Sequence, residues 1–173
     1  SRVEFGPTGG LTSYLEDDEL VTDHEVIVVG MVPETEYELQ AVSVTADGGE
    51  RRSDLLAWET GALPFGGLNV ELRAQAPEQA QPGWILADLL LEQHTDQTLV
   101  VMLDMEGRIV WYDDSLDGLE VGGIDATLVN DGTAVLVGGS VPAGERPVEL
   151  DLSGEVLWEG PEQGEIGSDG EMH

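Results

Sequence analysis

Cysteine and lysine are both absent from this chain of 173 residues. Without cysteine the chain can form no disulfide framework and no thiolate metal site, although this absence does not exclude export. No apolar run reaches the roughly 18 residues that a membrane-spanning helix requires, so we expect no membrane span. The chain begins at Ser1, with neither an initiator methionine nor a signal peptide. We therefore expect it to be a processed or excised piece of a longer protein.

Positive charge is scarce, because 6 arginines stand against 36 Asp and Glu residues and the formal net charge is −30 at pH 7. Such a chain repels phosphate backbones and anionic lipid, so we expect no nucleic-acid partner. The carboxylates are scattered, and 40% of the residues are hydrophobic, which favours a folded protein over a disordered tail. High salt would screen the self-repulsion, and calcium is a second way to offset it.

One stretch of the chain occurs twice in altered form. Leu103–Trp111 aligns with Leu150–Trp158, 47 positions later (150 − 103), and both read LD-[ML]-x-G-x-[IV]-[VL]-W. An apolar run, a Gly-containing turn and a β-branched run closed by Trp are typical of a tight β-hairpin. A hairpin repeat of roughly 40–50 residues indicates a β-propeller, in which blades stack because one blade cannot bury its own faces. The alternative is a β-sandwich in which a hairpin happens to recur.

Two further segments fit the same organisation. Trp84–Leu91 predicts a buried strand or a short helix, which periodicity cannot distinguish. Ala126–Val137 contains an Asn-Asp-Gly turn and predicts another hairpin. Residues 98–159 would then form roughly one and a half to two blades, and a propeller needs about four or more to close. The remainder of the same propeller is therefore the expected partner.

The first 60 residues alternate between strand and turn patterns. We expect a strand at His24–Gly30, a turn begun by Pro33, a strand at Glu38–Val44, and a middle strand at Val3–Gly6. The corner Met31–Tyr37 reads M-V-P-E-T-E-Y and resembles the L-x-P-x-T-x-Y corner of fibronectin type III domains. That resemblance implies a tyrosine corner, with the Tyr37 hydroxyl bonded to backbone.

Pro64 and the glycines around it break the strand pattern and indicate a domain boundary. We expect an all-β protein with a truncated fibronectin type III-like β-sandwich at residues 1–63, since there is no room for the first two strands. The first blades of a β-propeller are expected at residues 64–173.

The order of motifs resembles the start of a bacterial arylsulfotransferase-like protein, of the aryl-sulfate sulfotransferase family. After the fibronectin-like domain and a Leu-Pro linker come the family's segments, at Pro82–Leu86, Asp104–Tyr112, Leu128–Gly132 and Glu149–Trp158. The resemblance covers nearly the whole chain. It implies an exported propeller, extracellular or periplasmic, that moves sulfate between phenols through a covalent sulfohistidine.

The family's His-His-Asp segment follows the second Trp hairpin. His173 matches the first His of that segment, so the resemblance implies that His173 is a catalytic residue. It also implies that the histidine nucleophile lies outside this chain. The small-molecule partner would be an aryl sulfate or a phenol. Imidazole can attack sulfur as a neutral nucleophile, while other His and Arg side chains neutralise the sulfuryl oxygens. His24 is expected to be structural, and His94 to lie in a solvent-facing turn.

A weaker motif begins at Asp113. Asp113, Ser115, Asp117 and Gly118 match the opening of a calcium-binding loop, in which Asp113, Ser115 and Asp117 would be the metal ligands. Ile124 stands at the twelfth position, where such a loop needs a bidentate Glu, and a plain acidic turn is the alternative. No other cofactor is indicated.

Two other functional classes remain open. A quinoprotein-type propeller resembles D-x-x-x-G-x-x-x-W, but here Gly107 follows Asp104 by three positions, and Gly154 follows Asp151 likewise. A non-catalytic acidic extracellular propeller, acting as a binding or scaffold module, would share the fold and lack the catalytic His and Arg. Further His and Arg in later blades would favour the sulfotransferase.

Overall fold

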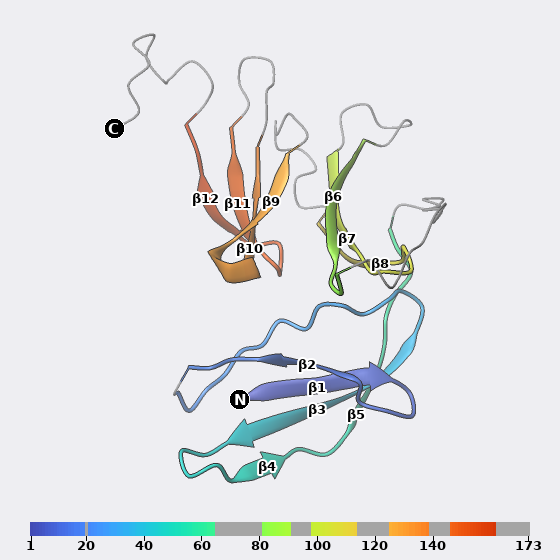
Figure 1. Ribbon diagram of the computed structural model, residues 1–173, viewed down its shortest axis with the longest axis vertical. Helices are drawn as coiled ribbons and strands as arrows, with labels where there is room; N and C mark the ends of the chain where they lie inside the picture. Colours follow the sequence, from blue (N-terminus) through green and yellow to red (C-terminus); the bar gives the residue numbers. More distant parts are fainter. Residues whose placement is uncertain (20, 65–80, 91–97, 114–124, 139–145, 162–173) are drawn as a thin grey trace. The chain divides into compact units, whose positions relative to one another are not determined.

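The computed structural model describes residues 1–19, 21–64, 81–90, 98–113, 125–138 and 146–161. Within these ranges the expected all-β class is confirmed, because the regular elements are strands of antiparallel sheets, with one 3-10 turn. The chain divides into two compact units, Ser1–Glu71 and Leu72–His173 (Figure 1). No helix in these ranges is long and apolar enough to span a membrane.

The N-terminal unit contains one five-stranded antiparallel sheet. Its order is β2-β1-β3-β4, and β5 also pairs with β3. The expected middle strand near Val3 is confirmed as β1, which lies between β2 and β3. The strands are β1 (Arg2–Pro7), β2 (Ser13–Glu16), β3 (Glu36–Val44), β4 (Glu50–Arg52) and β5 (Leu56–Glu59).

The core of this unit lies along β1 and β3. Phe5, Tyr37 and Val42 are buried there, and Val29 is buried from the connection that precedes β3. The Val32 N–H donates a hydrogen bond of 2.9 Å to the Tyr37 hydroxyl oxygen. The expected contact between the tyrosine hydroxyl and backbone is therefore confirmed, and it ties the entry of β3 to the preceding turn.

The strand expected at His24–Gly30 is wrong. These residues form an extended connection between β2 and β3 and join no sheet (Figure 1). Apolar alternation reports which side chains are half-buried, but a strand also needs a neighbour for its backbone hydrogen bonds. Here Val29 is buried while the backbone lacks a ladder partner.

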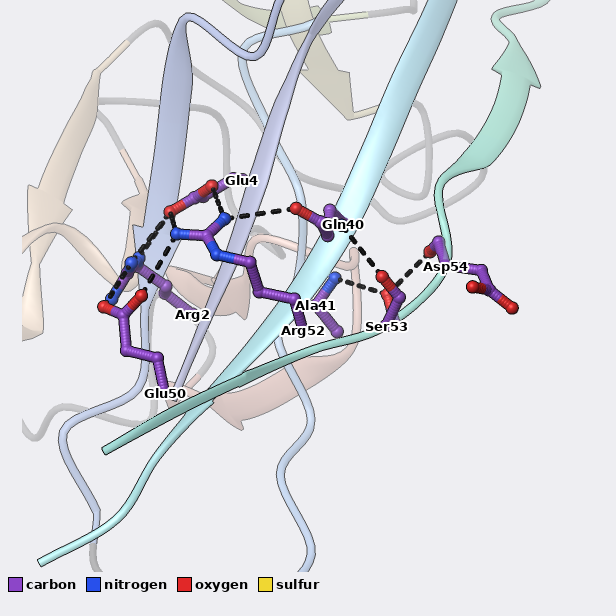
Figure 2. A network of polar contacts seen from close by, with 8 residues as sticks. All are labelled: Arg2, Glu4, Gln40, Ala41, Glu50, Arg52, Ser53 and Asp54. Carbon is purple, nitrogen blue, oxygen red and sulfur yellow. Dashed lines mark hydrogen bonds and ion pairs between the residues drawn. The ribbon is translucent and has the colours of Figure 1, made fainter. Parts of the chain in front are cut away.

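Two arginines cross-link one face of the N-terminal sheet (Figure 2). Arg2 and Arg52 both pair in register with Val42 of β3, so the three side chains share a face. Arg2 contacts Glu50 at 2.8 Å, and Arg52 contacts Glu4 at 2.6 Å and Glu50 at 3.1 Å. Hydrogen bonds from the arginines hold the pKa values of Glu4 and Glu50 below their usual range.

The described part of the C-terminal unit contains two antiparallel sheets. One has the order β6-β7-β8 and the other the order β12-β11-β10-β9 (Figure 1). The strands are β6 (Ile85–Leu90), β7 (Thr98–Leu103), β8 (Ile109–Asp113), β9 (Ala126–Val129), β10 (Ala134–Val137), β11 (Val148–Asp151) and β12 (Val156–Glu159).

The sequence left strand or helix open for the segment near Trp84 and predicted a hairpin at the Asn-Asp-Gly turn. The segment near Trp84 is a strand, β6, but the expected burial is wrong, because its described side chains are half-buried or exposed, with Ile85 55% exposed. The expected hairpin at the Asn-Asp-Gly turn is confirmed as β9–β10, closed by a 3-10 turn at Asn130–Gly132. The cores of the sheets lie in their inner strands, where the most buried side chains are Val100, Val101, Met102, Val135, Val137, Val148 and Leu150.

Candidate functional site

The repeated motif forms two hairpins, which we name the first tryptophan hairpin (β7–β8) and the second tryptophan hairpin (β11–β12). In the first, Asp104 Oδ1 accepts hydrogen bonds from the N–H groups of Glu106 (3.0 Å) and Arg108 (2.8 Å). The Gly107 N–H donates to the Asp104 carbonyl, and Gly107 has φ of 79°. Asp thus satisfies the turn's N–H donors, and Gly supplies the left-handed residue.

The second tryptophan hairpin repeats the backbone hydrogen bonds of this turn. Asp151 Oδ1 accepts from the N–H groups of Ser153 (2.8 Å) and Glu155 (3.0 Å), and Gly154 has φ of 88°. Burial raises the pKa of Asp151, but the hydrogen bonds from Ser153, Glu155 and Gly154 outweigh it and leave the pKa below its ordinary value. The folded state therefore favours the charged carboxylate.

The strand register of the two hairpins is also the same. Trp111 pairs with Met102, and Trp158 pairs with Glu149. Each residue of the second pair therefore follows its counterpart in the first pair by one repeat length. In each hairpin the register shifts immediately after the partner residue, which indicates a bulge at the same place. The two tryptophans thus hold equivalent positions in consecutive sheets.

The first tryptophan hairpin contacts the second. Trp111 Nε1 donates a hydrogen bond of 2.8 Å to the Leu152 carbonyl, in the turn of the second hairpin. Within that turn the Asp151 carbonyl and carboxylate accept the local hydrogen bonds. The Leu152 carbonyl instead accepts the indole N–H of the neighbouring sheet. Strand β6 also lies against β9. The two sheets are therefore packed together.

The closing strands of the hairpins differ sharply in exposure. Ile109, Val110 and Trp111 of β8 are 6%, 6% and 9% exposed. The equivalent residues of β12 are Val156 at 39%, Leu157 at 52% and Trp158 at 48%. Because local sequence and geometry match, the difference comes from what packs on each strand.

A second feature of the unit is a pair of acidic side chains. Asp88 of β6 and Asp113 of β8 both pair with Val100 of β7, so they share one face of the sheet. Asp113 is 4% exposed, and the buried Oδ2 of Asp88 has no hydrogen-bond partner among the described residues. Two strand spacings, about 10 Å, separate their backbones.

The expected calcium ligands are only partly described. Asp113 ends β8, whereas Ser115 and Asp117 lie outside the described residues. Among the residues that the structure does describe, no group of three or more His, Asp or Glu side chains could hold a metal ion. Calcium at this loop therefore stays a prediction.

Of the three histidines, His24 is the one within the described residues. His173 and His94 lie outside the described ranges. His24 Nδ1 lies 2.6 Å from Asp17 Oδ2, and hydrogen bonding to His24 lowers the pKa of Asp17. This contact closes the loop after β2, as expected of a structural histidine.

Arginine could neutralise a sulfate group, but four of the six arginines hold carboxylates of this chain. Besides Arg2 and Arg52, Arg108 contacts Asp104 at 2.7 Å and Arg146 contacts Glu159 at 2.8 Å. These pairs brace turns and neighbouring strands. The sequence alone did not reveal them, although the spacing of Asp104 and Arg108 within one turn was a usable signal.

Comparisons were made with protein-family models, with curated proteins and with solved structures. None of the three finds a match to this chain. The repeated hairpin and the packing between its two copies are therefore the observations on which a function can be argued.

Proposed function

We propose that this chain contributes the first blades of a β-propeller to an exported arylsulfotransferase-like protein, preceded by a fibronectin type III-like domain. The observation that carries the propeller is the hydrogen bond from Trp111 to the Leu152 carbonyl. It joins two sheets built on the same hairpin, as expected of blades that stack because neither covers its own faces. The Tyr37 hydroxyl contact supports the N-terminal assignment.

The proposed reaction is sulfate transfer from an aryl sulfate to a phenol. In it His173 helps neutralise the sulfuryl oxygens, and the histidine nucleophile lies outside this chain. Carboxylate partners already neutralise Arg2, Arg52, Arg108 and Arg146, so this proposal does not assign them to the sulfate. The remaining positive charge of the site would come from later blades.

The proposal is tested with His173→Ala in the full-length protein, assayed for transfer from a chromogenic aryl sulfate to phenol. We expect the rate to fall roughly 10²-fold or more, as for loss of a positioned acid–base or charge-stabilising group. His94→Ala is the matched control, because the sequence predicts a solvent-facing turn there, and it should leave the rate unchanged. Equal rates for wild type and His173→Ala would remove His173 from the site.

Two observations favour a second candidate, a non-catalytic acidic extracellular propeller that acts as a binding or scaffold module. A net charge of −30 repels an anionic aryl sulfate unless local cations offset it, and four arginines here are paired within the chain. Absence of any sulfate transfer by the wild-type protein, with the fold intact by circular dichroism, would favour this candidate.

A further inference from the structure

The last strand of the N-terminal sheet, β5, lies at an edge of that sheet. Among the strands that the structure describes, β5 pairs with β3 alone. All four of its residues are exposed, and two of them are large and apolar, Leu56 at 58% and Trp58 at 55%. An edge strand presents backbone N–H and C=O groups with which another strand can pair. The outer side of β5 is therefore a surface on which association can be argued.

The hydrogen bonds to β3 show which backbone groups of β5 point outward. The Thr60 N–H donates to the Thr35 carbonyl at 3.1 Å, so these two residues stand opposite each other as a hydrogen-bonded pair. Such pairs recur at every second residue of an antiparallel ladder. The next one joins Trp58 to Tyr37, which lie opposite each other in the register. The N–H and C=O groups of Ala57, between these pairs, therefore point away from β3.

The two faces of the N-terminal sheet differ sharply in charge. Alternation along the five strands places each side chain either on the face of Val42 or on the face of Tyr37. On the Val42 face the strands carry the carboxylates of Glu4, Glu16, Glu36, Glu38, Glu50 and Glu59. On the Tyr37 face the same strands carry no carboxylate, and Leu56 and Trp58 belong to this face. A chain of net charge −30 thus offers another acidic chain an edge with little like charge on one side.

We infer that β5 pairs with β5 of a second copy of this chain, antiparallel and about a two-fold axis at Ala57. Ala57 then lies opposite Ala57 of the second copy, and their outward N–H and C=O groups exchange two hydrogen bonds. Leu56 lies opposite Trp58 of the second copy on the carboxylate-free face, and the symmetry repeats this pair. Exposed apolar side chains that meet across two strands leave water and stabilise the pairing.

The same register keeps the carboxylates of the two copies apart. Glu59 lies opposite Leu55 of the second copy, so the paired strands place no two carboxylates directly opposite each other. Glu38 lies beside Ala57 on β3, and the two Glu38 residues stand three strand spacings apart. That separation of about 14 Å exceeds the screening length of about 8 Å at physiological ionic strength. The edge is therefore complementary to itself in hydrogen bonding, apolar contact and charge, which favours a second copy as the occupant.

Sedimentation equilibrium of the full chain tests the association. We expect the dimer dissociation constant to fall by about tenfold or more from low to molar salt, because salt screens the repulsion between copies. Ala57→Pro removes an outward N–H, so it should weaken the dimer by about tenfold or more, while the open side of an edge strand tolerates proline. Circular dichroism checks that the sheet is kept. Tyr14→Ser is the matched control, because Tyr14 is 62% exposed on β2, the opposite edge strand, and dimerisation should not change.

The absence of cysteine allows the register itself to be tested. In the inferred pair the two Ala57 Cα atoms stand about 5.5 Å apart, which is within the range of a disulfide. Ala57→Cys should therefore form a covalent dimer under mild oxidation. Its rate should exceed that of Tyr14→Cys, an exposed site on the other edge strand, by about tenfold or more. If Ala57→Pro unfolds the sheet, this comparison decides alone.

Three results would overturn the inference. One is a chain that stays monomeric from low to molar salt, and another is equal cross-linking of the two cysteine variants. The third is a dimer that Trp58→Ser dissociates and Ala57→Pro leaves intact, because the apolar side chains would then meet without strand pairing. The inference goes beyond the proposed function, and a protein that transfers no sulfate leaves each of these results unaffected.

Discussion

The two tryptophan hairpins share their turn, register and bulge, yet one closing strand is buried and the other is exposed. The turn is built from contacts within a few residues, so it forms wherever Asp and Gly stand at the right spacing. Burial of the strand depends on a neighbouring sheet, and the Trp111 indole finds one at the Leu152 carbonyl. The comparison separates what a hairpin does alone from what it does in a stack.

The largest effect should come from removing the tryptophans one at a time. Trp111→Ala should lower the free energy of unfolding by about 3–5 kcal/mol, as for other buried aromatic truncations. Trp158→Ala should lower it by about 1 kcal/mol or less, because half of the side chain is already in water. Urea unfolding of the two variants, followed by circular dichroism, measures the difference. Similar losses in the two variants would contradict the difference in burial between Trp111 and Trp158.

The turns, in contrast, should be equally sensitive. Asp104→Ala and Asp151→Ala each remove the acceptor of two backbone N–H groups. We expect each to lower the free energy of unfolding by about 1–2 kcal/mol, as for loss of a helix-capping side chain. Asp→Asn at either position keeps one acceptor oxygen and should recover part of the loss. A large difference between the two Ala variants would show that the turns are not equivalent.

The pH dependence of the second turn follows from the lowered pKa of Asp151. Its charged form stabilises the fold fully above the ordinary Asp pKa of about 4, and this contribution is lost as the pH falls through the lowered folded-state pKa. Asp151→Asn should therefore flatten the fall in urea midpoint below about pH 4. An unchanged slope would contradict the assigned role of the carboxylate.

The smallest effect concerns ions. Molar salt should raise the melting temperature of the wild type and both tryptophan variants alike, because screening acts on carboxylates scattered over the chain. A flat or falling melting temperature would contradict this. Calcium would act at one hairpin only, since the position equivalent to Asp113 in the second hairpin is Gly160. If millimolar calcium, and not magnesium, adds stability that Asp113→Asn abolishes, the Asp113 loop is a metal site.

Short-range patterns in the sequence specify the local elements of this protein. Asp, Gly and β-branched residues at fixed spacing specify the two hairpins, and the Asn-Asp-Gly turn specifies a third, because their hydrogen bonds close within a few residues. The corner before Tyr37 could be predicted for the same reason, because the Tyr37 hydroxyl accepts a hydrogen bond from a backbone N–H only five residues away. The all-β class follows from these elements.

Tertiary structure alone decided which elements found partners. His24–Gly30 has a strand pattern but joins no sheet, and Trp111 is covered while Trp158 is not. Arg2 and Arg52 meet Glu4 and Glu50 only because β1 and β4 flank β3. In each case the outcome depends on contacts between residues far apart in the chain. A local residue pattern does not specify which distant surface will bury a side chain or accept its hydrogen bond.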